Sequence, residues 1–154
     1  MPVLVDTNIL VRAVERRHPL MRTARLALLA LVRNGEQLCV TPQNIAEFWN
    51  VCTRPATARG GLGLSIADAD RRLRAIERLF RVLPDSPAAY QTWRGLLVAH
   101  GVSGVQVHDA RLVALMQVHG IAHILTLNGA DFARYPGIVP IDPASLSPSP
   151  QAAP

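Results

Sequence analysis

The strongest constraint on the fold is a series of apolar runs that are too short to be helices. They are VLV at 3–5, QLCVT at 37–41, RVLP at 81–84, HILTL at 123–127 and, more weakly, IVPI at 138–141. Continuous apolar runs of this length are typical of strands that are buried on both faces of a parallel sheet. The chain therefore predicts a sheet of four or five short parallel strands.

Helical patterns fill the intervals between these runs. They cover residues 19–32, 42–52, 66–80, 87–99 and 107–119. Pro42 favours a helix start because its missing N–H is not needed in the first turn, and Gly120 favours a helix end. Since parallel strands need crossover helices that cover the sheet, we predict a three-layer, doubly wound α/β fold with helices on both faces.

The length and composition predict one domain with a short tail. With 154 residues, 49% of them hydrophobic, the chain is long enough to bury a core. We place the domain at residues 1–142. We interpret residues 143–154, PASLSPSPQAAP, as a disordered tail, because a Pro/Ser/Ala segment has little apolar surface to bury.

The basic residues narrow the function. All sixteen are arginines, and the chain has no lysine. This excludes a P-loop nucleotide site, a protein kinase and Schiff-base chemistry, each of which needs a lysine amine. The net charge of +5 favours an anionic partner such as nucleic acid or an acidic protein segment.

Features of exported or membrane proteins are not visible. The first residues lack a basic segment followed by an apolar one, and the longest apolar stretches are too short to span a bilayer. Cys39 and Cys52 lie in apolar segments without metal-site spacing, so we interpret them as buried free thiols. We therefore expect a cytoplasmic protein.

The acidic residues, only eleven in number, fall at positions where a sheet binds its ligands. Asp6 ends the first strand, Asp131 follows the fourth strand after a short turn, and Asp109 begins a helix. Ligands of parallel sheets bind beyond the carboxyl ends of the strands, so we expect these three carboxylates to lie together. Each could instead cap a helix, and for any one of them alone this is the simpler interpretation.

The sequence pattern around Glu47 does not by itself predict a site residue. The apolar stripe of its helix contains Ile45, Phe48, Trp49 and Cys52, and Glu47 points away from it, which by itself predicts an exposed surface residue.

Several carboxylates in one place raise one another's pKa unless a cation neutralises them. Ligands that are all oxygens suit Mg²⁺ or Mn²⁺ better than zinc. In a basic protein, a carboxylate-held divalent ion indicates metal-assisted hydrolysis of phosphodiesters.

Four motifs link the chain to a known family. VLVDTNIL, NIAEFWNV, GVQVHDARLVALM and ILTLNGADFARYPGI follow one another in this order. The chain thereby resembles PIN-domain ribonucleases, and in particular the VapC toxins of type II toxin–antitoxin pairs, over about residues 2–142. The resemblance implies a parallel sheet between helices, an acidic site for Mg²⁺ or Mn²⁺, and endonucleolytic cleavage of RNA. It also implies a cognate antitoxin partner and a homodimer.

The resemblance assigns roles by position. Asp6, Glu47, Asp109 and Asp131 match the four acidic residues of the family. Asp6, Asp109 and Asp131 are the implied metal ligands, and Glu47 completes the site or polarises water. Many family members have a further acidic residue where this chain has Asn128, which favours one metal ion over two.

Other residues are candidates for supporting roles. Thr7, Asn8 and Thr126 lie next to the acidic positions, where Asn8 could orient a carboxylate and Thr126 could position water. Arg12 and Arg111 each follow a proposed ligand closely, so they could bind substrate phosphate or form an ion pair that orients a ligand carboxylate.

A second hypothesis is a catalytically inactive PIN-like module that binds RNA or a protein. Asn128 and the surface position that the helical pattern gives Glu47 both leave room for it. A nuclease would lose its activity with a chelator and with Asp6→Asn, whereas a binding module would be largely insensitive to both.

Overall fold

The computed structural model of the chain describes residues 1–146 and contains a five-stranded sheet in which every strand pair is parallel. The strands are β1 (Pro2–Val5), β2 (Gln37–Val40), β3 (Arg81–Val82), β4 (His123–Leu125) and β5 (Val139–Ile141). Their order in the sheet is β3-β2-β1-β4-β5. All five predicted apolar runs are strands, so the predicted parallel sheet is confirmed.

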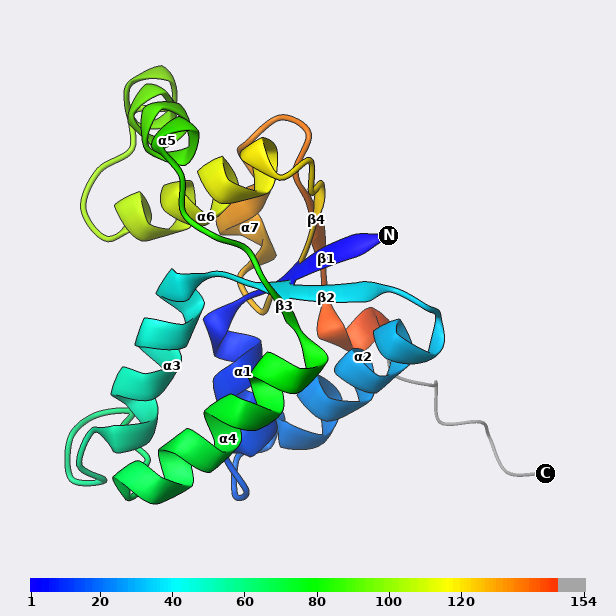
Figure 1. The fold of residues 1–154 in the computed structure, drawn as a ribbon, viewed down its shortest axis with the longest axis vertical. Helices are drawn as coiled ribbons and strands as arrows, with labels where there is room; N and C mark the ends of the chain where they lie inside the picture. Colours follow the sequence, from blue (N-terminus) through cyan, green and yellow to red (C-terminus); the bar gives the residue numbers. More distant parts are fainter. Residues whose placement is uncertain (147–154) are drawn as a thin grey trace.

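Helices cover both faces of this sheet (Figure 1). One face carries α1 (Thr7–Val14), α2 (Met21–Arg33), α3 (Pro42–Thr53) and α4 (Ile66–Leu79), and the other carries α5 (Pro87–Ala99), α6 (Gln106–Val118) and α7 (Gly129–Ala133). The three-layer α/β prediction is confirmed. The short helices α1 and α7 lie outside the predicted helical ranges. Within residues 1–146, no helix combines the length and apolar character that a membrane crossing requires.

Successive residues of the central strand pack into two separate cores. Val3 and Val5 pack against the helices α1 to α4, whereas Leu4 packs with Ile124 against α5 to α7. This follows from the two-residue period of a strand, which turns alternate side chains to opposite faces. Because both faces are covered, polar residues are excluded, which explains the uninterrupted apolar runs.

The connections diverge between β1 and β4. The chain leaves β1 for α1 on one face of the sheet and leaves β4 for α7 on the other. Such a point opens a crevice beyond the carboxyl ends of the strands, and ligands of open α/β sheets bind there. Asp6 and Thr126 are the residues that directly follow the two strands, and the Asp6 amide donates to the Leu125 carbonyl oxygen over 3.0 Å.

The cysteine thiols are free and buried, as the sequence analysis expects. Burial in the apolar core raises the pKa of Cys52 to about 11. A thiol with such a pKa is protonated at neutral pH, so Cys52 is an inert packing residue.

The ordered chain continues past the predicted domain boundary. Residues Pro143–Leu146 form a 3-10 helix, η1, in which Pro143 is buried and Leu146 packs against the core beside α2. The prediction of a disordered tail from residue 143 is therefore corrected for these residues, because a single leucine and a buried proline hold the segment on the domain. Residues 147–154 lie outside the described residues.

This packing gives a stability prediction. A chain that ends at residue 142 should unfold about 5 °C lower than one that ends at 146, because it loses about 2 kcal/mol of apolar burial. Thermal unfolding of the two truncated proteins, with the full chain as the control, measures the difference. Equal unfolding temperatures would mean that η1 contributes no stability.

Candidate active site

Asp6 is held at the crevice by side chains from two strand ends. Only 8% of its surface is exposed. Its Oδ2 atom accepts hydrogen bonds from Asn8 Nδ2 over 2.8 Å and from Thr126 Oγ1 over 2.7 Å. Although Asp6 occupies the N-cap position of α1, its side chain makes no capping hydrogen bond. Side-chain donors therefore orient this carboxylate. Burial raises its pKa, while the Thr7 and Asn8 amides at the start of α1 still favour its charged form and lower the pKa.

Backbone amides of the loop that follows β4 hold Asn8 and Thr126 in place. The Leu127 amide donates to Asn8 Oδ1 over 3.3 Å, and the Asn128 amide donates to Thr126 Oγ1 over 3.0 Å. Asn8 thus lies where the sequence analysis expects an orienting residue. The sequence suggests that Thr126 could position water. In the structure the Thr126 hydroxyl instead donates its hydrogen bond to the Asp6 carboxylate.

Glu47 faces the same crevice from α3. Its Oε2 accepts from Thr7 Oγ1 over 2.7 Å, and its Oε1 accepts from Gln43 Nε2 over 3.0 Å. The side chain is half-buried. The expectation from the helical pattern alone, an exposed surface residue, is therefore wrong, because tertiary contacts with α1 cover the flank of α3 that carries Glu47.

Two further polar residues of α3 belong to this network and are absent from the sequence-based set. Asn44 Nδ2 donates to Thr7 Oγ1 over 3.1 Å. Gln43 Nε2 also donates to the His108 carbonyl oxygen over 3.1 Å, which ties α3 to the start of α6. Gln43 precedes Glu47 by one helical turn, and that spacing is the signal that could have identified it.

The Asp109 carboxyl interacts electrostatically with the three other acidic residues of the predicted site. It lies half-buried in the first turn of α6. Burial raises the pKa of Asp109 to about 6, with further contributions from the negative charges of Asp6, Asp131 and Glu47. Burial also raises the pKa of Asp6, and the Glu47 carboxylate adds to that shift. The four predicted acidic residues therefore share one electrostatic environment, although Asp131 itself is exposed.

The donor set suits a hard divalent cation. Every candidate ligand is a carboxylate, and a cation would relieve the repulsion that raises the pKa of Asp109. In residues 1–146, no three histidine, cysteine, aspartate or glutamate side chains lie in a ready-made metal-binding group. The carboxylates are close enough to influence one another but do not converge on a single point, as is expected for like charges.

The remaining candidates lie around the acidic residues. Arg12 pairs with Glu15 and lines a cavity of about 390 Å³ that Thr7, Asn8 and Glu47 also line. Arg111 pairs with Asp85 over 2.8 Å. Among the described residues, neither arginine forms an ion pair with a proposed metal ligand.

Asn128 is the N-cap residue of α7, and its side chain is exposed without a capping hydrogen bond. The amide is thus free of a structural role in that helix. It lies two residues after Thr126 in the turn that follows β4.

Comparisons with known proteins agree with this architecture. The family model of the PIN domain matches residues 3–138. No curated protein matches the chain. Similar solved structures include VapBC2 of Rickettsia felis bound to a DNA fragment from its promoter, with a TM-score of 0.66 and 16% identity over 92% of this chain and 98% of the other.

Two further structures are similar to the chain. A toxin–antitoxin complex of Klebsiella pneumoniae has a TM-score of 0.62 and 22% identity over 92% of this chain and 97% of the other. VapC20 of Mycobacterium tuberculosis, a toxin that cleaves the sarcin-ricin loop, has a TM-score of 0.61 and 18% identity over 85% and 93% of the two chains. At these identities the likeness is one of fold.

Proposed function

The chain belongs to the PIN domain family, and from this premise we propose that it is a divalent-metal-dependent endoribonuclease and the toxin of a toxin–antitoxin pair. The observation that carries the proposal is the group of carboxylates beyond the ends of β1 and β4 in a basic protein. Burial and the charges of the three other carboxylates raise the pKa of Asp109 there. Maintaining such repulsion costs stability, which is typical of a functional site. The similar toxin that cleaves the sarcin-ricin loop supports RNA as the substrate.

The side chains of the proposed site are either metal ligands or residues that orient these ligands. Asp6, Asp109 and Asp131 would hold Mg²⁺ or Mn²⁺, an ion that polarises the phosphodiester and makes water a better nucleophile when it is bound. Asn8 and Thr126 fix the orientation of Asp6. The neutral Asn128 favours a single ion.

Glu47 is the candidate proton acceptor. Thr7 and Gln43 each donate to one of its oxygens, which fixes the carboxylate toward the crevice. Each carboxylate oxygen keeps a second lone pair, so Glu47 can accept the proton of the attacking water.

The partners follow from the same premise. Arg12 and Arg54 line the cavity beside Glu47, and their guanidinium groups suit the phosphates of an RNA strand. We propose a cognate antitoxin because the similar Rickettsia felis and Klebsiella pneumoniae structures are toxin–antitoxin complexes. A homodimer is part of the proposal on the family resemblance.

Cleavage of a mixed pool of structured RNA tests the proposed activity. The purified protein should cleave with Mg²⁺ or Mn²⁺ and stop when EDTA is added, and Glu77→Gln, which removes an exposed carboxylate of α4, should cleave like the wild type. If the protein bound the RNA without cleaving it under any of these conditions, the inactive binding module would be the better hypothesis.

Thr126→Val should lower cleavage by about 10–100-fold, the usual effect of losing a group that orients a metal ligand. The valine keeps the shape but removes the hydroxyl that donates to Asp6. Thr126→Ser keeps this donor and should stay within a few-fold of the wild type. Rates measured under saturating Mn²⁺ separate the two, and equal losses in both variants would point to packing instead.

A further inference from the structure

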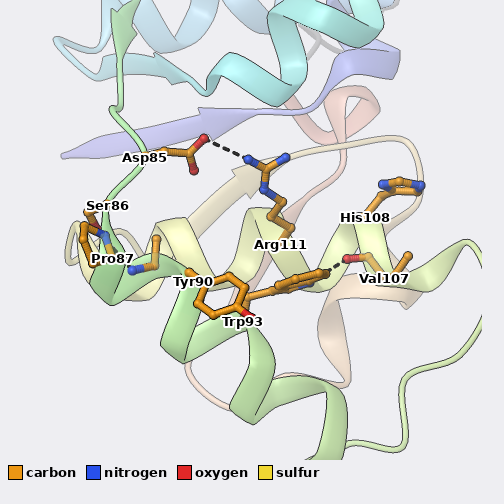
Figure 2. A pocket seen from close by; sticks show the side chains of 9 residues that line it. Asp85, Ser86, Pro87, Tyr90, Trp93, Val107, His108 and Arg111 are labelled. Carbon is orange, nitrogen blue, oxygen red and sulfur yellow. Dashed lines mark hydrogen bonds and ion pairs between the residues drawn. The ribbon is translucent and has the colours of Figure 1, made fainter.

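A larger cavity lies between α5 and α6, outside the acidic site. Its volume is about 700 Å³, and residues from the first two turns of both helices line it. Figure 2 shows its two sides: Tyr90 and Trp93 of α5 on one, and the ion pair of Arg111 with Asp85 on the other. None of these four side chains has a role in the function proposed above; Arg111 is a substrate candidate only from its position in the sequence.

The aromatic side of the cavity is fixed in place. Trp93 Nε1 donates to the Val107 carbonyl oxygen over 3.0 Å, which locks the indole against α6. The Tyr90 ring packs on it with a centroid distance of 6.1 Å and an interplanar angle of 53°. Tyr90 nevertheless remains 56% exposed. The fixed indole thus supports an exposed tyrosine ring, on whose face a flat ligand can stack.

The polar side presents a fixed guanidinium group. Arg111 Nη2 bonds to Asp85 Oδ2 over 2.8 Å, and Figure 2 shows the arginine extending from α6 toward that carboxylate above the aromatic rings. A guanidinium group has five N–H donors, so this pair leaves others for a ligand. The planar array of N–H donors on a guanidinium group recognises phosphates. It also recognises flat heterocycles that carry acceptor atoms on their edges.

The cavity and the acidic site share a wall. Val107, His108 and Arg111 line the cavity, while Asp109 of the same helix faces the acidic residues. Residues three and four apart share a helix face, whereas Asp109 lies between them and points elsewhere. The His108 carbonyl oxygen is bonded to Gln43, whose amide also donates to Glu47. The first turns of α6 therefore border both the cavity and the acidic site.

We propose that this cavity binds one unpaired nucleobase of the RNA substrate beside the scissile phosphate. The base stacks on the exposed Tyr90 ring and meets the Trp93 ring, which is tilted by 53° to Tyr90, at an angle. Arg111 contacts the edge of the base or the adjoining phosphate. The proposal rests on the proposed nuclease function and adds a site that selects substrate. The shared wall with a site for phosphodiesters, the flat aromatic faces and the net charge of +5 favour RNA over a peptide side chain of an antitoxin.

Binding of short single-stranded RNA in EDTA tests the cavity apart from cleavage. Tyr90→Ala should weaken this binding about tenfold, because stacking on an aromatic ring is worth about 1–3 kcal/mol per base. Tyr90→Phe keeps the ring and should bind like the wild type. Val98→Ala, a change at an 84% exposed site of the same helix, is the matched control. The same strand synthesised without nucleobases should bind wild type and Tyr90→Ala equally.

Tryptophan fluorescence reports occupancy directly. RNA should quench the emission of the wild type, and the strand without nucleobases should not. In Trp93→Phe the quenching should disappear, because Trp49, on α3, lies away from this cavity. Thermal unfolding checks that each variant is folded.

The outcomes separate this inference from the proposed function. Metal-dependent cleavage by the wild type together with unchanged RNA binding by Tyr90→Ala would overturn the inference and leave the nuclease standing. Base-dependent quenching without any cleavage would support the cavity and overturn the nuclease. Quenching that depends on protein concentration but not on RNA would mean that a second copy of the chain covers the cavity. A loss of antitoxin binding with intact RNA binding in Tyr90→Ala would assign the cavity to the protein partner.

Discussion

Asp6→Asn should lower RNA cleavage by more than about 100-fold while the fold stays intact. Residues that only orient a metal ligand typically cost about 10–100-fold, and Asp6 would supply the ligating oxygen itself. An asparagine has the same shape, and its side-chain oxygen can still accept from Asn8 and Thr126. The loss would therefore come from the missing negative charge, because the hydrogen bonds around the position survive.

The measurement is a cleavage time course of wild type, Asp6→Asn and Glu77→Gln with Mn²⁺, together with thermal unfolding of each. Unfolding temperatures that match while only Asp6→Asn is inactive would separate chemistry from folding. If Asp6→Asn cleaved at a rate within a few-fold of the wild type, Asp6 would be a structural carboxylate and the metal site would have to be sought elsewhere.

The sheet could be predicted from the sequence because strands that are buried on both faces appear as continuous apolar runs. The buried strand positions are apolar, so even the three-residue strands β4 and β5 stand out between helical patterns. The polar strand residues Gln37, Arg81 and His123 each begin a strand at an exposed or half-buried position. The position of Asp6 followed from the same logic, since the end of a central parallel strand is where ligands bind. Helices α1 and α7 were not predicted as ranges because five to eight residues contain too few turns for a clear period.

Glu47 shows what periodicity cannot supply. The apolar stripe of α3 predicts which face of the helix enters the core, but not which neighbour covers its flank. The contact of Glu47 with Thr7 joins residues 40 positions apart, and that of Gln43 with His108 joins residues 65 apart. Only the family resemblance selected Glu47. The four-residue spacing could have suggested Gln43 once Glu47 was chosen, whereas nothing in the local sequence selected Asn44.

The aromatic cavity lies beyond sequence reasoning for a similar reason. Tyr90 and Trp93 read as ordinary apolar positions of a helix, and Arg111 reads as a neighbour of Asp109. Their common surface exists only because α5 and α6 pack side by side and the segment before α5 places Asp85 opposite Arg111. The boundary error at residue 143 is simpler, because composition predicts disorder for a Pro/Ser/Ala segment and does not register one well-packed leucine.

Asp109→Asn should abolish cleavage and at the same time stabilise the metal-free protein at neutral pH. The pKa of Asp109 is raised from 3.8 to about 6, so the folded state binds a proton more tightly than the unfolded state does. The free energy of unfolding therefore falls as the pH rises from about 4 to about 6, and the full penalty remains above that range. A neutral asparagine removes a penalty of about 1–3 kcal/mol. It forfeits about 0.3–1 kcal/mol of favourable interaction with the start of α6, so a net gain remains.

The stabilisation should depend on pH and on metal in a way that packing alone cannot reproduce. In EDTA, the unfolding temperature of Asp109→Asn should exceed that of the wild type by about 2–6 °C at neutral pH, and the gap should close near pH 4, where the wild-type carboxyl is protonated. Mg²⁺ or Mn²⁺ should narrow the gap at neutral pH, because it binds the folded wild type and stabilises it by mass action. A gap that stayed constant from pH 4 to neutral pH would show that the change acts through packing or helix propensity. A wild type that no divalent ion stabilised would argue against a metal site at these carboxylates.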